Sequence, residues 1–388
     1  MPDNSIPEWK RIHQEATIID VHAHPSLKVS LFNRVLTRRF RAARSWNPFS
    51  VRTDFHKLKK GNVDVLWSTV YAPEKEIQKE CRWVKLMRFI MPCKYKKVFC
   101  RPYFDVSNEM LDEMEQQVKK SVNPETGKPI AKMAYSVKEL NEILEQQTDR
   151  PIAVLHNIEG AHSLDMNLDN LLHFFDRGVA YLSLAHFNPN GVANPCFPYP
   201  ESVQVCGCFK GDRNLTLGLT ELGEQVVEKM VELGMIIDIT HCTPPARKQV
   251  YDIVGNQMPI IASHVGAYEI NPSAYNLKDW EIKKIAETGG VVAVIFMNYW
   301  LMPHETKRGL NFIARTLDHF INIGGIDHVA VGTDYDGFND PPDDIKDASQ
   351  LHKLTQRLIA EEYSEDMIKK IWGDNVLRVI REGWGKKE

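Results

Sequence analysis

Thr17-Ile18-Ile19-Asp20-Val21-His22-Ala23-His24-Pro25 is an apolar run that ends in two histidines one residue apart. β-Branched and apolar residues closed by a proline predict a buried strand, and alternate residues of a strand point to one side, so His22 and His24 would lie together. Two imidazoles on one side can hold one metal ion. Such a short motif also arises by chance, with one histidine in the core and the other in a loop. The metal interpretation therefore depends on further ligands elsewhere in the chain.

Seven further apolar stretches follow and alternate with helical patterns. We predict strands at residues 63–70, 152–159, 181–186, 235–241, 260–264, 291–296 and 328–334. Between them the hydrophobic period becomes helical, as at residues 168–177, where the pattern stops before Gly178, in the manner of a helix that ends on glycine. Eight short strands alternating with helices predict a parallel (β/α)8 TIM barrel. We expect one domain, residues 1–388, with insertions after the first and second strands.

Bulk composition narrows the class of protein. The 388 residues are 43% hydrophobic and 26% charged, with a formal net charge of -3, which is typical of a folded globular chain and argues against a nucleic-acid partner. Residues 1–15 lack the apolar stretch of a signal peptide, and no run reaches the roughly 18 apolar residues that a membrane span requires. We therefore expect a cytoplasmic protein without a membrane span.

Two other features are less specific. Segment 27–60 is rich in arginine and lysine, and we expect a solvated loop-and-helix insertion there, with a rim that meets an acidic substrate as the alternative. The seven cysteines are scattered and have no zinc-finger spacing. We expect free thiols and leave open a disulfide that involves Cys100 or Cys206.

Polar residues recur at the carboxyl ends of the predicted strands. They are His22, His24, Glu159, His186, His241, His264 and Asp334. A single buried histidine has an ordinary structural explanation, such as a hydrogen bond to a carbonyl group. In a barrel, however, the carboxyl ends of all strands converge on the face that holds the active site. The shared position of these residues therefore predicts one functional site.

Several segments carry a resemblance to a known family. They are Ile158-Glu159-Gly160-Ala161-His162-Ser163-Leu164, Tyr181-Leu182-Ser183-Leu184-Ala185-His186, Gly218-Leu219-Thr220, Asp238-Ile239-Thr240-His241, Ala262-Ser263-His264 and Gly332-Thr333-Asp334-Tyr335-Asp336-Gly337. In these segments and their order the chain resembles the membrane dipeptidase (renal dipeptidase) family of the amidohydrolase superfamily. The resemblance covers nearly the whole chain and implies an amidohydrolase-like barrel, a zinc-dependent dipeptidase activity and a homodimer.

The resemblance also implies a role for each residue at the strand ends. His22 and His24 would bind a first zinc ion, Glu159 would bridge two ions, and His241 and His264 would bind the second. A water shared by the ions would supply the attacking hydroxide, since two cations lower its pKa toward neutrality. Asp334 would take the proton of this water and pass it to the leaving amine. His186 would face the substrate and stabilise the tetrahedral oxyanion.

Two positions depart from the family pattern. The family has His-x-Asp in the first strand, whereas His24 here replaces the anionic ligand by a neutral one and leaves the site with one more positive charge. After the sixth strand the family has Arg-Asn, and the arginine clamps the terminal carboxylate of the dipeptide. Tyr275 and Asn276 occupy these positions here, and a tyrosine hydroxyl gives at most one neutral hydrogen bond. Lys278 lies nearby as a less selective point charge.

Three interpretations of function follow. The first is a zinc hydrolase that cleaves dipeptides or related small amides. The second is an amidohydrolase that acts on another small substrate, such as an N-acyl amino acid, a lactone or a cyclic amide. The third is a catalytically impaired barrel that keeps its metal for structure. The presence of Asp334 beside a full set of ligands favours catalysis, because a purely structural metal site has little use for an additional carboxylate.

Overall fold

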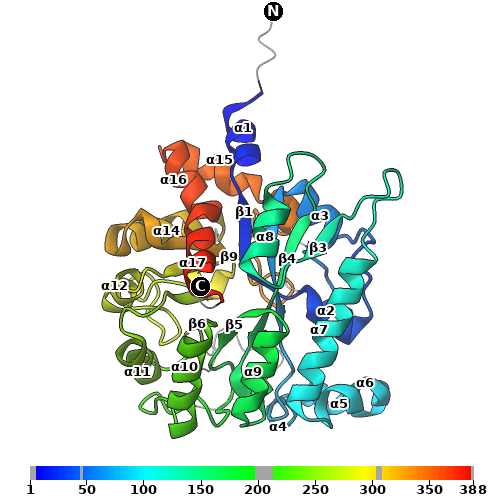
Figure 1. Ribbon diagram of the computed structural model, residues 1–388, viewed down its shortest axis with the longest axis vertical. Coiled ribbons are helices and arrows are strands. Elements are labelled where there is room, and N and C mark those ends of the chain that lie inside the picture. The colour runs from blue at the N-terminus through cyan, green and yellow to red at the C-terminus, as the bar shows by residue number, and fades with distance from the viewer. Residues whose placement is uncertain (1–5, 44–46, 197–212, 303–307, 386–388) are drawn as a thin grey trace, which may run out of the picture.

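The computed structural model describes residues 6–43, 47–196, 213–302 and 308–385. Its centre is a sheet of parallel strands in which neighbours in space follow one another along the chain (Figure 1). The strands are β1 (Ile18–Ala23), β2 (Val63–Val70), β4 (Ile152–Glu159), β5 (Val179–Ser183), β6 (Ile236–Asp238), β7 (Ile260–Val265), β8 (Val291–Ile295) and β9 (Val329–Gly332). All eight predicted strands are therefore confirmed.

Backbone hydrogen bonds between the first and last strands close this sheet. The N–H of Asp334 donates to the carbonyl of His22 at 2.8 Å, and the N–H of His24 donates to the carbonyl of Tyr335 at 2.8 Å. The result is a nearly closed parallel barrel of eight strands, as the alternation of strands and helices predicts. A ninth strand, β3 (Ala131–Met133), pairs with β4 outside this path and was not predicted, because three residues carry too little periodicity.

Apolar side chains on the two sides of a barrel strand belong to two different hydrophobic clusters. Val65 and Trp67 of β2 share a cluster with Ala153 and Leu155 of β4. The intervening residues, such as Leu66, belong to a second and larger cluster that includes residues of the surrounding helices. Because both sides of every barrel strand are buried, these strands are continuous apolar runs in the sequence rather than alternating ones.

Helices surround the barrel. They are α1 (Glu8–Glu15), α2 (Pro25–Phe32), α3 (Phe55–Lys60), α4 (Ile77–Glu80), α5 (Arg82–Ile90), α6 (Pro92–Phe99), α7 (Tyr103–Lys119), α8 (Val137–Leu144), α9 (Leu168–Asp176), α10 (Glu221–Leu233), α11 (Pro244–Val254), α12 (Asp279–Glu287), α13 (Asn298–Leu301), α14 (Leu310–Gly324), α15 (His352–Ala360), α16 (Glu365–Lys369) and α17 (Asn375–Gly383). No helix within the four described ranges is long and apolar enough to cross a membrane.

The basic segment 27–60 agrees with its prediction in part. Arg38, Arg39 and Arg41 are exposed, as we expected of a solvated insertion, but the side chains of Lys28 and Arg52 are buried. The physical reason is an anchor that lies far away in the sequence. The carboxylate of Asp336, behind β9, accepts the backbone N–H groups of Arg52 at 2.8 Å and of Thr53 at 3.0 Å. This contact holds the segment against the carboxyl end of the barrel.

The cysteines also differ in part from expectation. Cys93, Cys100, Cys196 and Cys242 are free thiols. Cys81, between α4 and α5, is disulfide-bonded, so the expectation of free thiols is wrong at this position, while Cys206 lies outside the described residues. Disulfide partners meet through the tertiary fold, so their spacing along this chain could not reveal the bond.

Candidate metal centre

The carboxyl end of the barrel brings all seven predicted strand-end residues together. β1 carries His22 and leads into His24, and β4 ends on Glu159. The remaining four follow the ends of β5, β6, β7 and β9 or lie within them: His186, His241, His264 and Asp334. All are buried, and Asp334 is the most exposed of them at 8%. The ring of strand ends is therefore one buried polar site.

The Glu159 carboxylate lies in the middle of this site, close to five imidazoles. Its Oε1 atom lies 3.4 Å from Nε2 of His22, 3.2 Å from Nε2 of His241 and 3.4 Å from Nε2 of His264. Its Oε2 atom lies 3.4 Å from Nε2 of His24 and 3.4 Å from Nε2 of His186. The two oxygens thus face two separate sets of imidazoles, and His22 shares an oxygen with His241 and His264 rather than with His24, its predicted partner. A carboxylate with imidazoles at both oxygens can still bridge two ions.

Asp334 and His186, which we predicted as catalytic residues, lie as close to the centre as the predicted ligands. Oδ1 of Asp334 is 3.3 Å from Nε2 of His24. Three sets of donor atoms are each compact enough to hold an ion: His22, His24 and Asp334; His22, Glu159 and His264; and Glu159, His186 and His241. The histidine and carboxylate donors are those that zinc takes in hydrolytic sites.

Hydrogen bonds on the outer ring nitrogens fix two of the tautomers. Tyr181 donates its hydroxyl proton to the carbonyl of Val21 at 3.0 Å, so its oxygen accepts from Nδ1 of His22 at 2.7 Å. In the same way Ser263 donates to Asp238 at 2.7 Å and accepts from Nδ1 of His264 at 2.8 Å. A neutral imidazole protonated at Nδ1 presents a lone pair at Nε2. Both Nε2 lone pairs therefore face Glu159, as metal ligands require.

Burial and neighbouring charges shift the pKa values of the histidines and of Glu159 in this centre. Burial lowers the pKa values of His22 and His241 to about 4. Burial also opposes charge on His264, but the Glu159 carboxylate outweighs it and raises the pKa of that imidazole. Burial works against the charge on Glu159 as well, yet the surrounding imidazoles hold its pKa well below the usual value. An anionic carboxylate beside the neutral imidazoles of His22 and His241 is the protonation state that metal binding requires.

The backbone is strained at two of the site residues. His241 has φ of 67° and Asp334 has φ of 54°, which is the left-handed region that side chains other than glycine seldom adopt. Each such residue costs roughly 1–3 kcal/mol, and residues of this kind cluster at functional sites. Here the strain falls where β6 and β9 end and the chain turns away from the barrel.

Glu74 is a functional candidate that the sequence analysis missed. It follows β2, and the Oε2 atom of this buried residue lies 3.5 Å from Nδ1 of His186, within ion-pair distance but without a hydrogen bond between them. Its Oε1 atom accepts the backbone N–H groups of Phe187 at 3.2 Å and Asn188 at 2.9 Å. Burial alone would raise the pKa of Glu74, but His186 keeps it below the usual value. The sequence did contain one indication of this residue, because Glu74 is a carboxylate only four residues beyond Val70, where β2 ends.

Tyr275 lies beside the centre, but its hydroxyl points to the backbone. The ring lies 5.1 Å from that of His241 and stacks on Trp300 at 4.1 Å. The hydroxyl donates to the carbonyl of His264 at 2.5 Å. Both side-chain N–H groups of Asn276 donate to backbone carbonyls at 2.9 Å, and Lys278 packs 5.0 Å above the ring of Tyr268. Tyr275 thus supports the backbone of His264, a predicted ligand, at the position where the family resemblance places a substrate-facing arginine.

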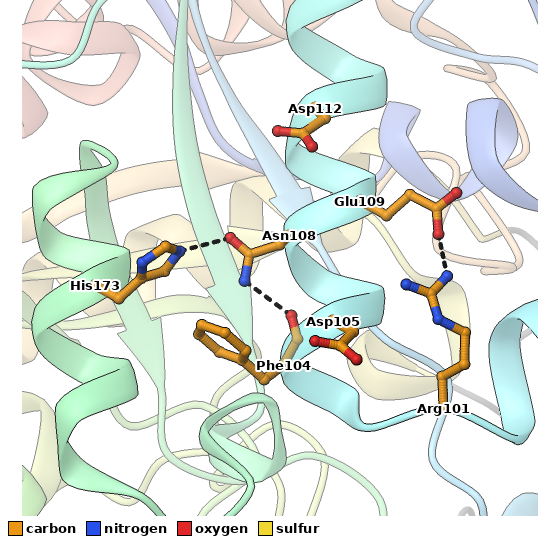
Figure 2. A pocket seen from close by; sticks show the side chains of 7 residues that line it. All are labelled: Arg101, Phe104, Asp105, Asn108, Glu109, Asp112 and His173. Carbon is orange, nitrogen blue, oxygen red and sulfur yellow. Dashed lines mark hydrogen bonds and ion pairs between the residues drawn. The ribbon is translucent and has the colours of Figure 1, made fainter.

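A separate hollow on the surface does not share this chemistry. It lies between α7 and α9 and is lined by Arg101, Phe104, Asp105, Asn108, Glu109, Asp112 and His173 (Figure 2). Four of its polar residues pair with one another: His173 bonds to Asn108 at 2.8 Å, and Arg101 pairs with Glu109. None of the strand-end residues lines it, so the centre in the barrel is the better candidate site.

A parallel barrel with histidines and carboxylates at the strand ends defines a metal-dependent hydrolase type of site. The chain belongs to the membrane dipeptidase family, peptidase family M19, whose model matches residues 6–385. It is 31% identical over 244 residues to an uncharacterized protein in the pqqA 5' region of Klebsiella pneumoniae. That alignment covers 61% of this chain and 84% of the relative. It is 29% identical over 232 residues to Dipeptidase 3 of Mus musculus, with 60% of this chain and 44% of the relative covered. The chain thus spans less than half the length of that dipeptidase.

A solved structure shares the fold. The metallo peptidase from Rhodobacter sphaeroides, liganded with a phosphinate mimic of the dipeptide L-Ala-D-Ala, matches with a TM-score of 0.73. The sequences are 22% identical, and the match covers 95% of this chain and 99% of the other. The barrel and its surrounding helices are therefore those of the family.

Proposed function

We propose that this protein is a metal-dependent dipeptidase that hydrolyses the amide bond of dipeptides or related small amides. The observation that carries the proposal is the convergence of five histidine Nε2 atoms on one buried carboxylate, Glu159. A carboxylate buried among imidazoles has little structural value unless cations occupy the space between them. The proposed ligands are His22, His24, Glu159, His241 and His264, and the proposed cofactor is a pair of zinc ions.

Bound ions would supply an acidified water and polarise the carbonyl group of the substrate. The protein would supply the proton transfers and the orientation of the reacting groups. Asp334, the most exposed of the seven residues, would accept the proton of the attacking water and deliver it to the leaving amine. His186, held from behind by Glu74, would donate to the developing oxyanion.

His24 changes the electrostatics of the first ion position. With an imidazole in place of the family aspartate, the ligand set carries one fewer negative charge, so a bound water would be more acidic and the ion less tightly held. The neighbouring Asp334, at 3.3 Å from Nε2 of His24, compensates part of this charge.

The position of Tyr275 bears on the substrate. Its hydroxyl is committed to the carbonyl of His264, so it does not reproduce an arginine clamp for a free carboxylate. We therefore propose that the enzyme prefers small amides whose far end is neutral, with N-acyl amino acids, lactones and cyclic amides as the second class of candidate substrates.

One experiment tests both parts of the proposal. Metal analysis of the purified protein under zinc-replete conditions should give two equivalents, and hydrolysis should be measured for one dipeptide and its carboxyl-amidated form. We expect the amidated form to have the higher kcat/KM. Two bound ions without hydrolysis of any amide, ester or lactone on the panel would indicate an impaired enzyme, and loading of one equivalent of metal or none would overturn the binuclear centre.

A further inference from the structure

Helices α5 and α6 form a projection beside α7, at the lower right of Figure 1. Residues 84–101 of this projection carry six cations and no aspartate or glutamate, within a chain whose formal net charge is -3. The six cations are Lys85, Arg88, Lys94, Lys96, Lys97 and Arg101. This concentration of positive charge is local, so it calls for a local explanation.

Large apolar side chains are exposed on the same projection. Leu86 is 42% exposed, Phe89 78% and Ile90 68%. They are spaced i, i+3 and i+4 on α5, so they form one stripe on the helix. Met91, where the chain passes from α5 to α6, extends the stripe and is also exposed. A helix on the surface of a globular protein normally turns such a stripe toward the core, and an exposed stripe marks an interaction site.

The cations of the projection divide into two groups. Three hold it to the body: Lys94 donates to Asn33 at 2.8 Å, Lys97 pairs with Glu113 at 2.6 Å, and Arg101 pairs with Glu109. Lys85, Arg88 and Lys96 are exposed and make no ion pair within the part of the chain that the structure describes. These three cations are available to a partner and lie on the two helices that carry the apolar stripe.

We propose that this projection docks on the surface of an anionic lipid bilayer. Leu86, Phe89 and Ile90 would enter the boundary between headgroups and acyl chains, while the three free cations would contact lipid phosphates. An exposed apolar stripe next to basic residues is the pattern of helices that lie in a membrane interface. A second copy of this chain is a poorer occupant, because two such projections would place like charges together.

The docking surface also has a defined relation to the candidate metal centre. The projection is inserted between the carboxyl end of β2 and α7, and the carboxyl ends of the strands carry the centre. Docking would therefore hold the metal-bearing end of the barrel toward the bilayer, with α10, α11 and α12 farther from it (Figure 1).

Cosedimentation of the full chain with vesicles tests the proposal. We expect binding to vesicles of phosphatidylcholine mixed with phosphatidylserine, and little binding to phosphatidylcholine alone. Each cation near an anionic surface contributes about fivefold in partition, so the triple variant Lys85→Gln, Arg88→Gln, Lys96→Gln should lose on the order of a hundredfold. A matched triple, Lys248→Gln, Lys283→Gln, Lys284→Gln, changes exposed cations of α11 and α12 and should bind as the unaltered protein does.

A second variant separates the apolar contribution. Phe89→Ser with Ile90→Ser keeps every charge and should lower partition at least tenfold, because two exposed side chains no longer enter the bilayer. Equal binding of the unaltered protein to neutral and anionic vesicles would overturn the proposal. So would a loss of self-association in the Phe89/Ile90 variant without vesicle binding by the unaltered protein. Metal content and amide hydrolysis should be unchanged in all these variants, so failure here is distinguishable from failure of the proposed dipeptidase.

Discussion

At the scale of single residues, the hydrogen bond at Nδ1 of an imidazole determines whether its Nε2 atom is free to bind a metal ion. Tyr181 accepts from Nδ1 of His22 because its own proton is committed to Val21. Tyr181→Phe should remove this acceptor without changing the shape of the ring, and the loss of such a partner weakens metal binding by roughly 10–100-fold. Titration of the metal-free protein with zinc measures the effect.

A matched variant separates this role from a general loss of packing. Tyr251→Phe removes a buried hydroxyl that has no hydrogen-bond partner among the residues the structure describes. It should bind zinc as the unaltered protein does. Equal zinc affinity in both variants would show that Tyr181 does not set the tautomer of His22.

Asp334 provides a second test at this scale. Asp334→Asn should leave zinc content nearly intact, because five other donors remain, while turnover should fall roughly a hundredfold or more with the loss of the proton-transfer group. Asp336→Asn is the contrasting variant, since Asp336 holds the backbone of Arg52 and Thr53 and should affect stability more than the chemical step. Unchanged turnover in Asp334→Asn would exclude the proposed role.

At the scale of secondary-structure elements, the strands were predictable and the connections between them were not. Each barrel strand is a short apolar run whose pattern is local, and where a polar residue lies at the end of a strand, as at Glu159, it is visible in the sequence. Glu74 lies in a connection, four residues beyond β2, and meets His186 only through the fold. Tyr181 lies 159 residues from His22 along the chain. Contacts of this kind depend on strand order and register, which local periodicity does not contain.

Glu74 links two of these elements, the end of β2 and the turn after β5. Glu74→Gln removes the negative charge that faces Nδ1 of His186, so His186 should lose its fixed orientation. We expect kcat to fall roughly 10–100-fold, as for other partners that orient a catalytic or ligating imidazole, with KM and zinc content nearly unchanged. Steady-state kinetics with metal analysis provides the measurement.

The control for Glu74 is another carboxylate of the same connection. Glu80 pairs with Arg213 at 3.1 Å and does not contact the centre, so Glu80→Gln should keep normal kinetics. If zinc content falls together with kcat in Glu74→Gln, then His186 acts as a metal ligand rather than as a substrate-facing residue, as its place in the set of Glu159, His186 and His241 would allow.

At the scale of the whole molecule, the centre joins parts of the chain that are far apart in sequence. Its proposed ligands lie in or shortly after β1, β4, β6 and β7, and β9 closes on β1 beside them through the backbone of His22 and Asp334. The barrel and its ring of strand ends were predictable because the alternation of strands and helices extends over the whole chain. The anchoring of segment 27–60 by Asp336 was not, because it is a single contact between distant loops.

This arrangement predicts that metal binding stabilises the whole barrel. A ligand that binds the folded state at a hundred times its Kd adds about 2.7 kcal/mol of stability, so chelation should lower the Tm by several degrees and added zinc should restore it. Thermal unfolding of the chelated and reloaded protein measures the shift. His241→Ala should abolish it, whereas His319→Gln, in the partly exposed surface group of Glu269, Asp279 and His319, should preserve it. A shift that persists in His241→Ala but is lost in His319→Gln would place the stabilising ion at the surface, and the convergence on Glu159 would then need another explanation.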